Sequence, residues 1–135
     1  MKKFYVASSF KNIDDVRYVS DYLEKHGFIH TYDWTRNERA SSFEDLKQIG
    51  TLEKEAVQEA DFLIVILPAG KGSHIEFGIA LAEGKRIFLH SPNDEVSQFE
   101  TTSTFYHLTE VIKSVGDLSD LLKLVNCYGK RDSIY

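Results

Sequence analysis

The chain has 135 residues, of which 42% are hydrophobic and 27% charged, proportions typical of one globular domain spanning residues 1–135. Its formal net charge is −5, from 16 basic and 21 acidic residues. That balance argues against nonspecific binding to nucleic acid or to an anionic membrane, because both need a basic face. We therefore expect a small-molecule ligand.

The amino-terminal segment alternates strand and helix patterns. Residues 3–8 (KFYVAS) and 28–32 (FIHTY) are rich in the aromatic and β-branched residues that favour strands. The segment between them carries apolar residues at helical spacing. Asn12 is the expected N-cap of this helix, and Gly27 is placed to end it in the left-handed conformation.

The rest of the chain continues the alternation. The run at 61–67 (DFLIVIL) is almost continuously apolar, which is typical of a central parallel strand covered on both faces. The other predicted elements are an irregular segment at 33–43, a helix from about Glu44 to Ala60, a glycine-bearing loop running into a helix within 70–85, a strand at 85–90, a loop at 91–103, an edge strand at 110–115 and a closing helix at 118–128.

Strands that alternate with helices predict an α/β fold, a three-layer α/β/α sandwich with right-handed crossovers. Five strands favour a parallel sheet of flavodoxin-like order 2-1-3-4-5, in which the chain reverses direction between strands one and three. Ligands of such sheets bind at this switch point. The predicted crevice therefore lies between residues 8–10 and residues 68–73.

Neither the apolar run near the amino terminus nor the cysteine content suggests export or metal binding. The apolar run at 4–7 is far shorter than a signal-peptide core or a membrane span, so we expect a cytoplasmic protein. Cys127 is the only cysteine, and no Cys/His cluster stands at ligand spacing. We therefore predict no metal site and no cofactor.

The stretch GKGS at 70–73 resembles two phosphate-binding motifs without matching either. A Walker A loop needs a glycine where Val65 stands, and a dinucleotide fingerprint needs one where Ile75 stands. What remains is a helix start whose backbone N–H groups, made approachable by Gly70 and Gly72, can hold an anion or a sugar hydroxyl.

Glu76 follows this loop and has two compatible interpretations. With Ser73 it forms an S-x-x-E capping box. The helix is also apolar on nearly every side, so Glu76 has little solvated surface, and the field at the helix start should hold it ionised. An oriented, ionised carboxylate beside a crevice is what nucleophilic attack on a glycosyl carbon requires.

Glu53 is a second candidate carboxylate. On a helical wheel of about 100° per residue it falls inside the apolar stripe formed by Leu46, Ile49 and Ala56. It either turns outward from the edge of that stripe or faces inward. Two inward carboxylates on neighbouring helices would suit acid/base chemistry.

The pattern of residues 60–87 resembles the nucleoside 2-deoxyribosyltransferase superfamily, including its 2′-deoxynucleoside 5′-phosphate N-hydrolase branch. In that family an Ala-Asp-strand leads to G-[ST]-x-x-E-x-G-x-A and then to Gly-Lys before the next strand. The opening FYVASSF is also similar to the family's first strand and substrate loop. The matching motif positions are Gly72, Ser73, Glu76, Gly78, Ala80, Gly84 and Lys85.

This resemblance implies cleavage of the N-glycosidic bond of a nucleoside or nucleotide. Glu76 would attack the anomeric carbon, and Glu53, eight positions before Asp61 as in the hydrolase branch, would assist the leaving base. A homo-oligomer is implied, with the C-terminal Tyr128 and Tyr135 as candidates for closing a neighbour's site. The residues that would line the sugar, base or phosphate site are Tyr5, Ser8, Ser9, Phe10, Trp34, Gly70, Gly72 and Ser73.

Two departures from the family keep other functions open. Family transferases have Gly-Pro in the first loop and a sugar-binding Asp after strand three, whereas this chain has Ser8-Ser9 and an Asp-free loop in which Lys71 would favour a phosphorylated substrate. Arg36 or Arg39 could serve phosphate as well. The alternatives are a TIR-like NAD glycohydrolase and a non-catalytic nucleotide-binding module.

Overall fold

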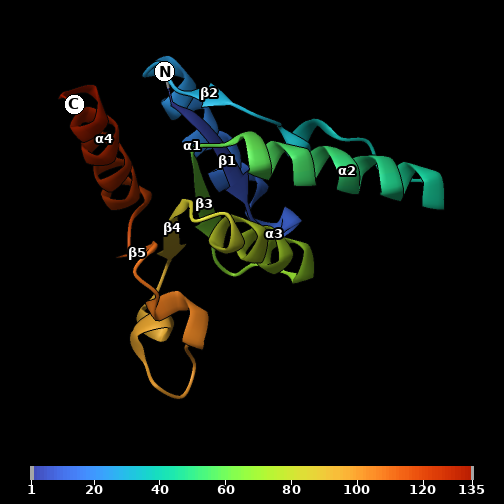
Figure 1. The fold of residues 1–135 in the computed structure, drawn as a ribbon. Helices are drawn as coiled ribbons and strands as arrows, with labels where there is room; N and C mark the ends of the chain where they lie inside the picture. Colours follow the sequence, from blue (N-terminus) through green and yellow to red (C-terminus); the bar gives the residue numbers. More distant parts are fainter. Residues whose placement is uncertain (1, 135) are drawn as a thin grey trace.

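The central feature of the fold is a five-stranded parallel sheet in the order β2-β1-β3-β4-β5, which confirms the predicted fold class (Figure 1). The structure, a computed structural model, describes residues 2–134, with side chains through Lys130. All five residues of β3 are buried, as expected for a central strand. The strands are β1 (Lys3–Ala7), β2 (Ile29–His30), β3 (Phe62–Ile66), β4 (Arg86–Ser91) and β5 (Val111–Val115).

Helices cover both faces of this sheet. Helices α2 and α3 pack together on one face, and α1 and α4 pack on the other (Figure 1). Gly27 follows α1 with φ +89°, so its predicted left-handed conformation is confirmed. The helices are α1 (Ile13–Lys25), α2 (Phe43–Glu59), α3 (Lys71–Ala82) and α4 (Leu118–Ile134).

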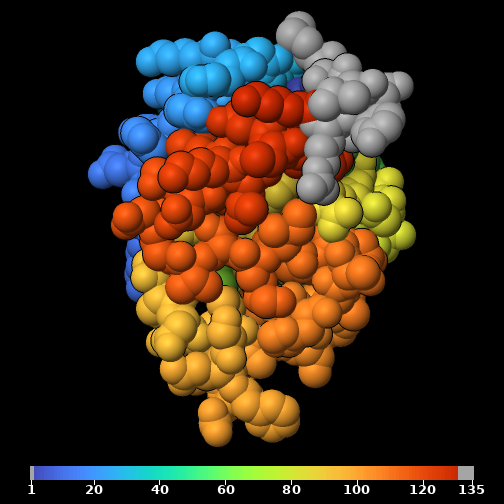
Figure 2. All heavy atoms as spheres, turned by 90° about the vertical axis from the view of Figure 1, so that its left-hand side faces the viewer, coloured from blue at the N-terminus to red at the C-terminus, as the bar shows by residue number. Residues whose placement is uncertain are grey.

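An aromatic cluster fills the α4 side of the sheet. The ring of Phe62 lies edge-on to those of Phe88 and Tyr128, at centroid distances of 5.6 and 5.5 Å. Figure 2 shows this side of the molecule, with α4 across its middle and the β4–β5 connection below it. That connection, predicted as a loop, contains two short 3₁₀ turns at Asp94–Ser97 and Thr104–His107.

Strand β2 is shorter than predicted, because a side chain takes over its role. Only Ile29 and His30 pair with β1. Further along the same edge, the indole Nε1 of Trp34 donates to the carbonyl oxygen of Val6 at 2.7 Å, and Trp34 is 6% exposed. The indole thus satisfies a backbone acceptor that a longer β2 would have paired.

Helix α2 is held at its carboxyl end. The Lys85 ammonium donates to the backbone oxygens of Gln58 and Ala60, where a positive charge is favourable.

The amino-terminal half of α2 extends beyond the sheet (Figure 1), leaving Leu46 55% exposed and Leu52 40% exposed. This part of the apolar stripe is therefore partly uncovered within one chain.

None of the helices in residues 2–134 is both long and apolar enough to cross a bilayer.

Replacing Trp34 by Phe should destabilise the fold, because it keeps a large ring but leaves the buried Val6 oxygen without its donor. We expect the free energy of unfolding in denaturant to fall by about 1–3 kcal/mol. Tyr18→Phe, at an exposed position on α1, is the control and should change it by less than about 0.5 kcal/mol. Equal stability of the two variants would show that the indole bond contributes nothing.

Candidate functional site

A tyrosine hydroxyl joins the two predicted carboxylates. Tyr5, in β1, is fully buried, and its hydroxyl lies 2.5 Å from Glu76 Oε2 and 3.2 Å from Glu53 Oε2. Glu76 comes from α3 and Glu53 from α2, the two helices that cover this face of the sheet. Three side chains from three elements thus meet at one point.

Glu76 reaches this point from the second turn of α3. The helix begins at Lys71 with Gly70 as its N-cap, so Ser73 lies inside the helix and is no cap. The predicted capping box is therefore wrong. The Glu76 carboxylate accepts from the Tyr5 hydroxyl instead, because a partner on β1 lies within reach of the second turn.

Burial dominates the electrostatics of the site. Glu76 is 8% exposed, and desolvation, followed by the negative charge of Glu53, raises its pKa to about 8, although the Tyr5 hydrogen bond opposes the shift. The expectation that the helix start holds this carboxylate ionised is thus wrong, because burial outweighs the field of the helix start. Burial and the same carboxylates raise the pKa of Tyr5 far above its usual range, so it remains a neutral donor.

The proton count of this cluster matters for its chemistry. Tyr5 carries one hydroxyl proton, yet its oxygen lies within bonding distance of two carboxylates. When the pair holds one further proton, Glu53 can donate to the Tyr5 oxygen while Tyr5 donates to an ionised Glu76. This state contains a neutral acid and an oriented anion side by side, the two groups that acid-assisted nucleophilic substitution needs.

The space beside the start of α3 is open. A Cβ added at Gly70 or Gly72 would meet no atom within 4 Å, and neither glycine has a positive φ. Ser73 is 5% exposed, and no described residue bonds its hydroxyl. Together with the first N–H groups of the helix, it could bind an anion or a sugar hydroxyl there.

The loop after β1 is fastened to the end of β3. The Ser8 hydroxyl donates to the Ile66 oxygen at 2.7 Å, and the Ser9 hydroxyl donates to the Pro68 oxygen at 3.2 Å. The prediction that Asn12 caps α1 is wrong. Its side-chain amide instead donates to Ser8 Oγ and to the Pro68 oxygen. These bonds shape the predicted crevice, and contact of Ser8 and Ser9 with a substrate stays a prediction.

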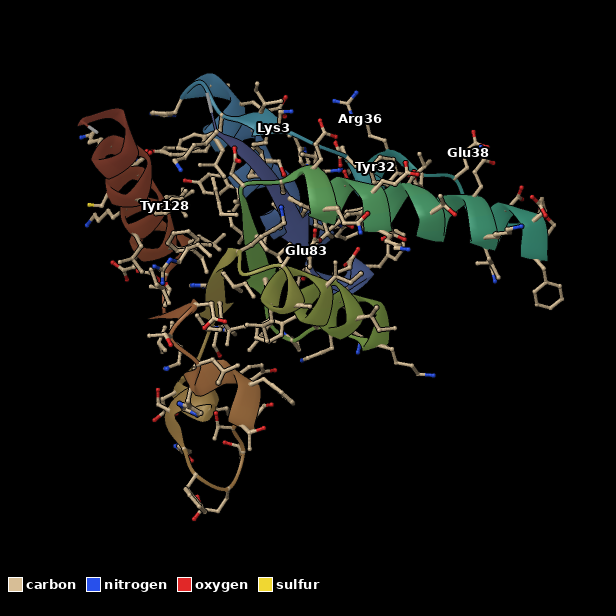
Figure 3. The ribbon with its side chains drawn as sticks, in the orientation of Figure 1. Lys3, Tyr32, Arg36, Glu38, Glu83 and Tyr128 are labelled. Atoms are coloured by element: carbon tan, nitrogen blue, oxygen red, sulfur yellow. The ribbon has the colours of Figure 1, made fainter. Side chains whose placement is uncertain are left out.

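A pocket of about 630 Å³ borders Glu53. We call it the α2 pocket. Trp34 and Phe10, whose rings meet edge-on at 5.3 Å, line it together with Leu46, Ile49, Asn37 and Glu53. The segment that carries Tyr32, Arg36 and Glu38 runs beside α2 at this place (Figure 3). The volume suits a ligand of nucleotide size.

Other candidates lie elsewhere or have structural partners. Arg36 pairs with Asp33 at 3.1 Å, whereas Arg39 lines the α2 pocket. Tyr128 packs against the aromatic cluster across the sheet from the α2 pocket (Figure 3). Tyr135 is outside the described residues. Within that described part, no group of three or more His, Cys, Asp and Glu side chains could hold a metal ion.

Sequence reasoning named Tyr5 only as a residue lining the site and missed that it links the carboxylates. The available signal was its polar hydroxyl inside an otherwise apolar strand, KFYVA. Sequence reasoning also missed Asn37, which lines the α2 pocket. Its residue type gave no signal of this position, because asparagine is common in polar loops.

No family model matches the sequence, and no curated protein was found to be similar to it. Among solved structures, the fold is similar to that of the CMP N-glycosidase BcmB of Clostridium botulinum, with a TM-score of 0.64 and 23% sequence identity. The alignment covers 94% of this chain and 99% of that one. At this identity the likeness establishes a shared fold.

Proposed function

We propose that this protein cleaves the N-glycosidic bond of a nucleoside or nucleoside 5′-monophosphate, with Glu76 as nucleophile. The observation that carries the proposal is the Tyr5 hydroxyl placed between the buried carboxylates of Glu76 and Glu53. Fold alone never establishes an activity. The similarity to a protein described as a CMP N-glycosidase supports the same reaction class.

The reaction would proceed in two steps. Ionised Glu76 attacks C1′ of the sugar while the bond from C1′ to the base nitrogen breaks, and neutral Glu53 gives its proton to the departing base. A water molecule then attacks C1′ of the glycosyl ester, Glu53 takes up the water proton, and Glu76 is released. If a second base attacks in place of water, the result is base exchange.

The polar groups at the start of α3 suit the rest of the substrate. The open space at Gly70 and Gly72, the buried Ser73 and the exposed Lys71 would hold sugar hydroxyls or a 5′-phosphate. Trp34 and Phe10 would contact the base in the α2 pocket.

We further propose that a second copy of the chain completes the site, as the family resemblance implies. Apolar side chains at the α2 pocket and on α2 and α3 lack cover within one chain: Phe10 is 66% exposed, Phe43 90% and Ile75 65%. Burying such a patch between two copies would stabilise a dimer.

Glu76→Gln should abolish base release, because the amide still accepts from Tyr5 but is no nucleophile. We expect kcat to fall at least about a thousandfold, measured as free base released from nucleosides, nucleoside 5′-monophosphates and NAD. Acid-quenched wild type should carry a glycosyl adduct at Glu76 by mass spectrometry.

The matched control is Glu83→Gln, an exposed position just beyond α3, which should retain wild-type rates (Figure 3). Equal turnover by the Glu76 variant would remove Glu76 as nucleophile. Release from NAD alone would favour the glycohydrolase alternative. Binding of nucleotides by a wild type that releases no base would identify a non-catalytic module.

The pH dependence follows from the raised pKa of Glu76. Because the proposed reaction needs one proton on the carboxylate pair, kcat/KM of the free enzyme should fall as pH rises through about 8, where that proton is lost.

The stability of the fold should also fall with rising pH. The folded-state pKa exceeds the unfolded value, so the stabilisation present at low pH is lost as pH rises from about 4.5 to about 8. Unfolding of wild type and Glu76→Gln at several pH values measures this, and parallel curves would contradict it.

Leu46→Glu tests the second copy, because it places a charge in the exposed apolar patch of α2. Light scattering should give a mass above one 15.5 kDa chain for wild type and near one chain for the variant. Tyr18→Glu, at a similarly exposed position on α1, should leave the mass unchanged. A monomeric wild type at working concentration would refute the proposal.

A further inference from the structure

The wall of the α2 pocket opposite helix α2 is fixed by its own hydrogen bonds. The Asp33 carboxylate accepts from the Thr35 backbone N–H at 3.0 Å, and from Arg36 Nε at 3.1 Å. The Arg17 guanidinium donates to the Thr35 oxygen at 3.0 Å, which ties this segment to α1. Since Trp34 is also bonded to β1, the wall holds its shape without a ligand.

Asn37 ends this wall with a defined amide orientation. Its backbone N–H donates to the Trp34 oxygen at 3.1 Å, and its side-chain Oδ1 accepts from the Tyr32 hydroxyl at 2.6 Å. With the oxygen held by Tyr32, the amide nitrogen presents two N–H donors. No residue in the described part of the chain accepts from them, and Asn37 lines the α2 pocket.

The surroundings of these donors suit a flat heteroaromatic ring. Trp34 and Phe10 on one side and Leu46 and Ile49 on the other provide apolar walls. Pockets of this kind use few polar groups to set orientation and specificity. A ring that enters must place a hydrogen-bond acceptor against Asn37, because a donor there would leave both groups without a partner.

We propose that Asn37 determines base specificity, donating to a carbonyl oxygen or unprotonated ring nitrogen at the edge of the base. Tyr32 is a positioning residue that acts through Asn37 by holding the amide oxygen away from the ligand. This inference rests on the proposed function and adds the group that selects the base.

Asn37→Asp tests the inference directly, because a carboxylate still accepts from Tyr32 but offers an acceptor where the amide offered donors. With the wild type's best base, kcat/KM should fall about ten- to hundredfold, mainly through KM. Tyr32→Phe, which leaves the pocket lining intact, should cause a smaller loss of kcat/KM. It should also narrow the difference in kcat/KM between cytosine and uracil nucleotides, and the difference between adenine and hypoxanthine nucleotides.

The control is a second asparagine–tyrosine pair on the other face of the sheet. Asn126 on α4 donates to the Tyr22 hydroxyl at 2.8 Å, and neither lines the α2 pocket. Asn126→Asp and Tyr22→Phe should keep the wild-type kcat/KM for every base.

The outcomes separate this inference from the proposed function. If the wild type releases base and Asn37→Asp matches it on all bases, the role of Asn37 is refuted while the proposed function stands. If the wild type releases no base, calorimetric binding of the same nucleoside monophosphates replaces turnover. Weaker binding to Asn37→Asp would then support the inference, and equal or absent binding would overturn it.

Discussion

The candidate site depends on one constraint: two carboxylates are brought out of water against a single tyrosine hydroxyl. Burial of such groups is costly unless each finds a partner or a proton. Tyr5 contacts both Glu76 and Glu53, and burial raises the pKa of Glu76, so that a proton on the pair relieves the repulsion between them. The packing of α2 and α3 on β1 therefore brings both carboxylates to the same hydroxyl.

Several structural bonds maintain that packing. Lys85, a position in the family-like motif, holds the carboxyl end of α2 and so sets where Glu53 meets the sheet. Across the crevice, Ser8 and Asn12 fasten the loop after β1 to the end of β3. The two carboxylates and the tyrosine thus lie on regular elements, while the loops at the carboxyl edge are pinned to one another, an arrangement that keeps the side chains of the candidate site in position.

The exposed half of α2 connects the pocket with assembly. That half projects past the sheet, carrying apolar side chains that one chain leaves in water (Figure 1). The same helix face forms one wall of the α2 pocket, whereas the opposite wall, ending at Asn37, is rigid by its own bonds. A neighbouring copy on α2 would therefore enclose the pocket from the side that one chain leaves open.

Local patterns in the sequence determined the strand order, the buried run of β3, the left-handed Gly27 and the inward side of α2 that carries Glu53. These depend on periodicity and on backbone preferences of nearby residues. The capping role of Glu76, the cap at Asn12 and the extent of β2 were predicted wrongly. In each case a partner distant in sequence, or its absence, decided the outcome. Tyr5 and Glu76 lie 71 positions apart. Only the folded sheet brings them together, because a side chain bonds the partner that packing places within reach, whatever its local motif favours.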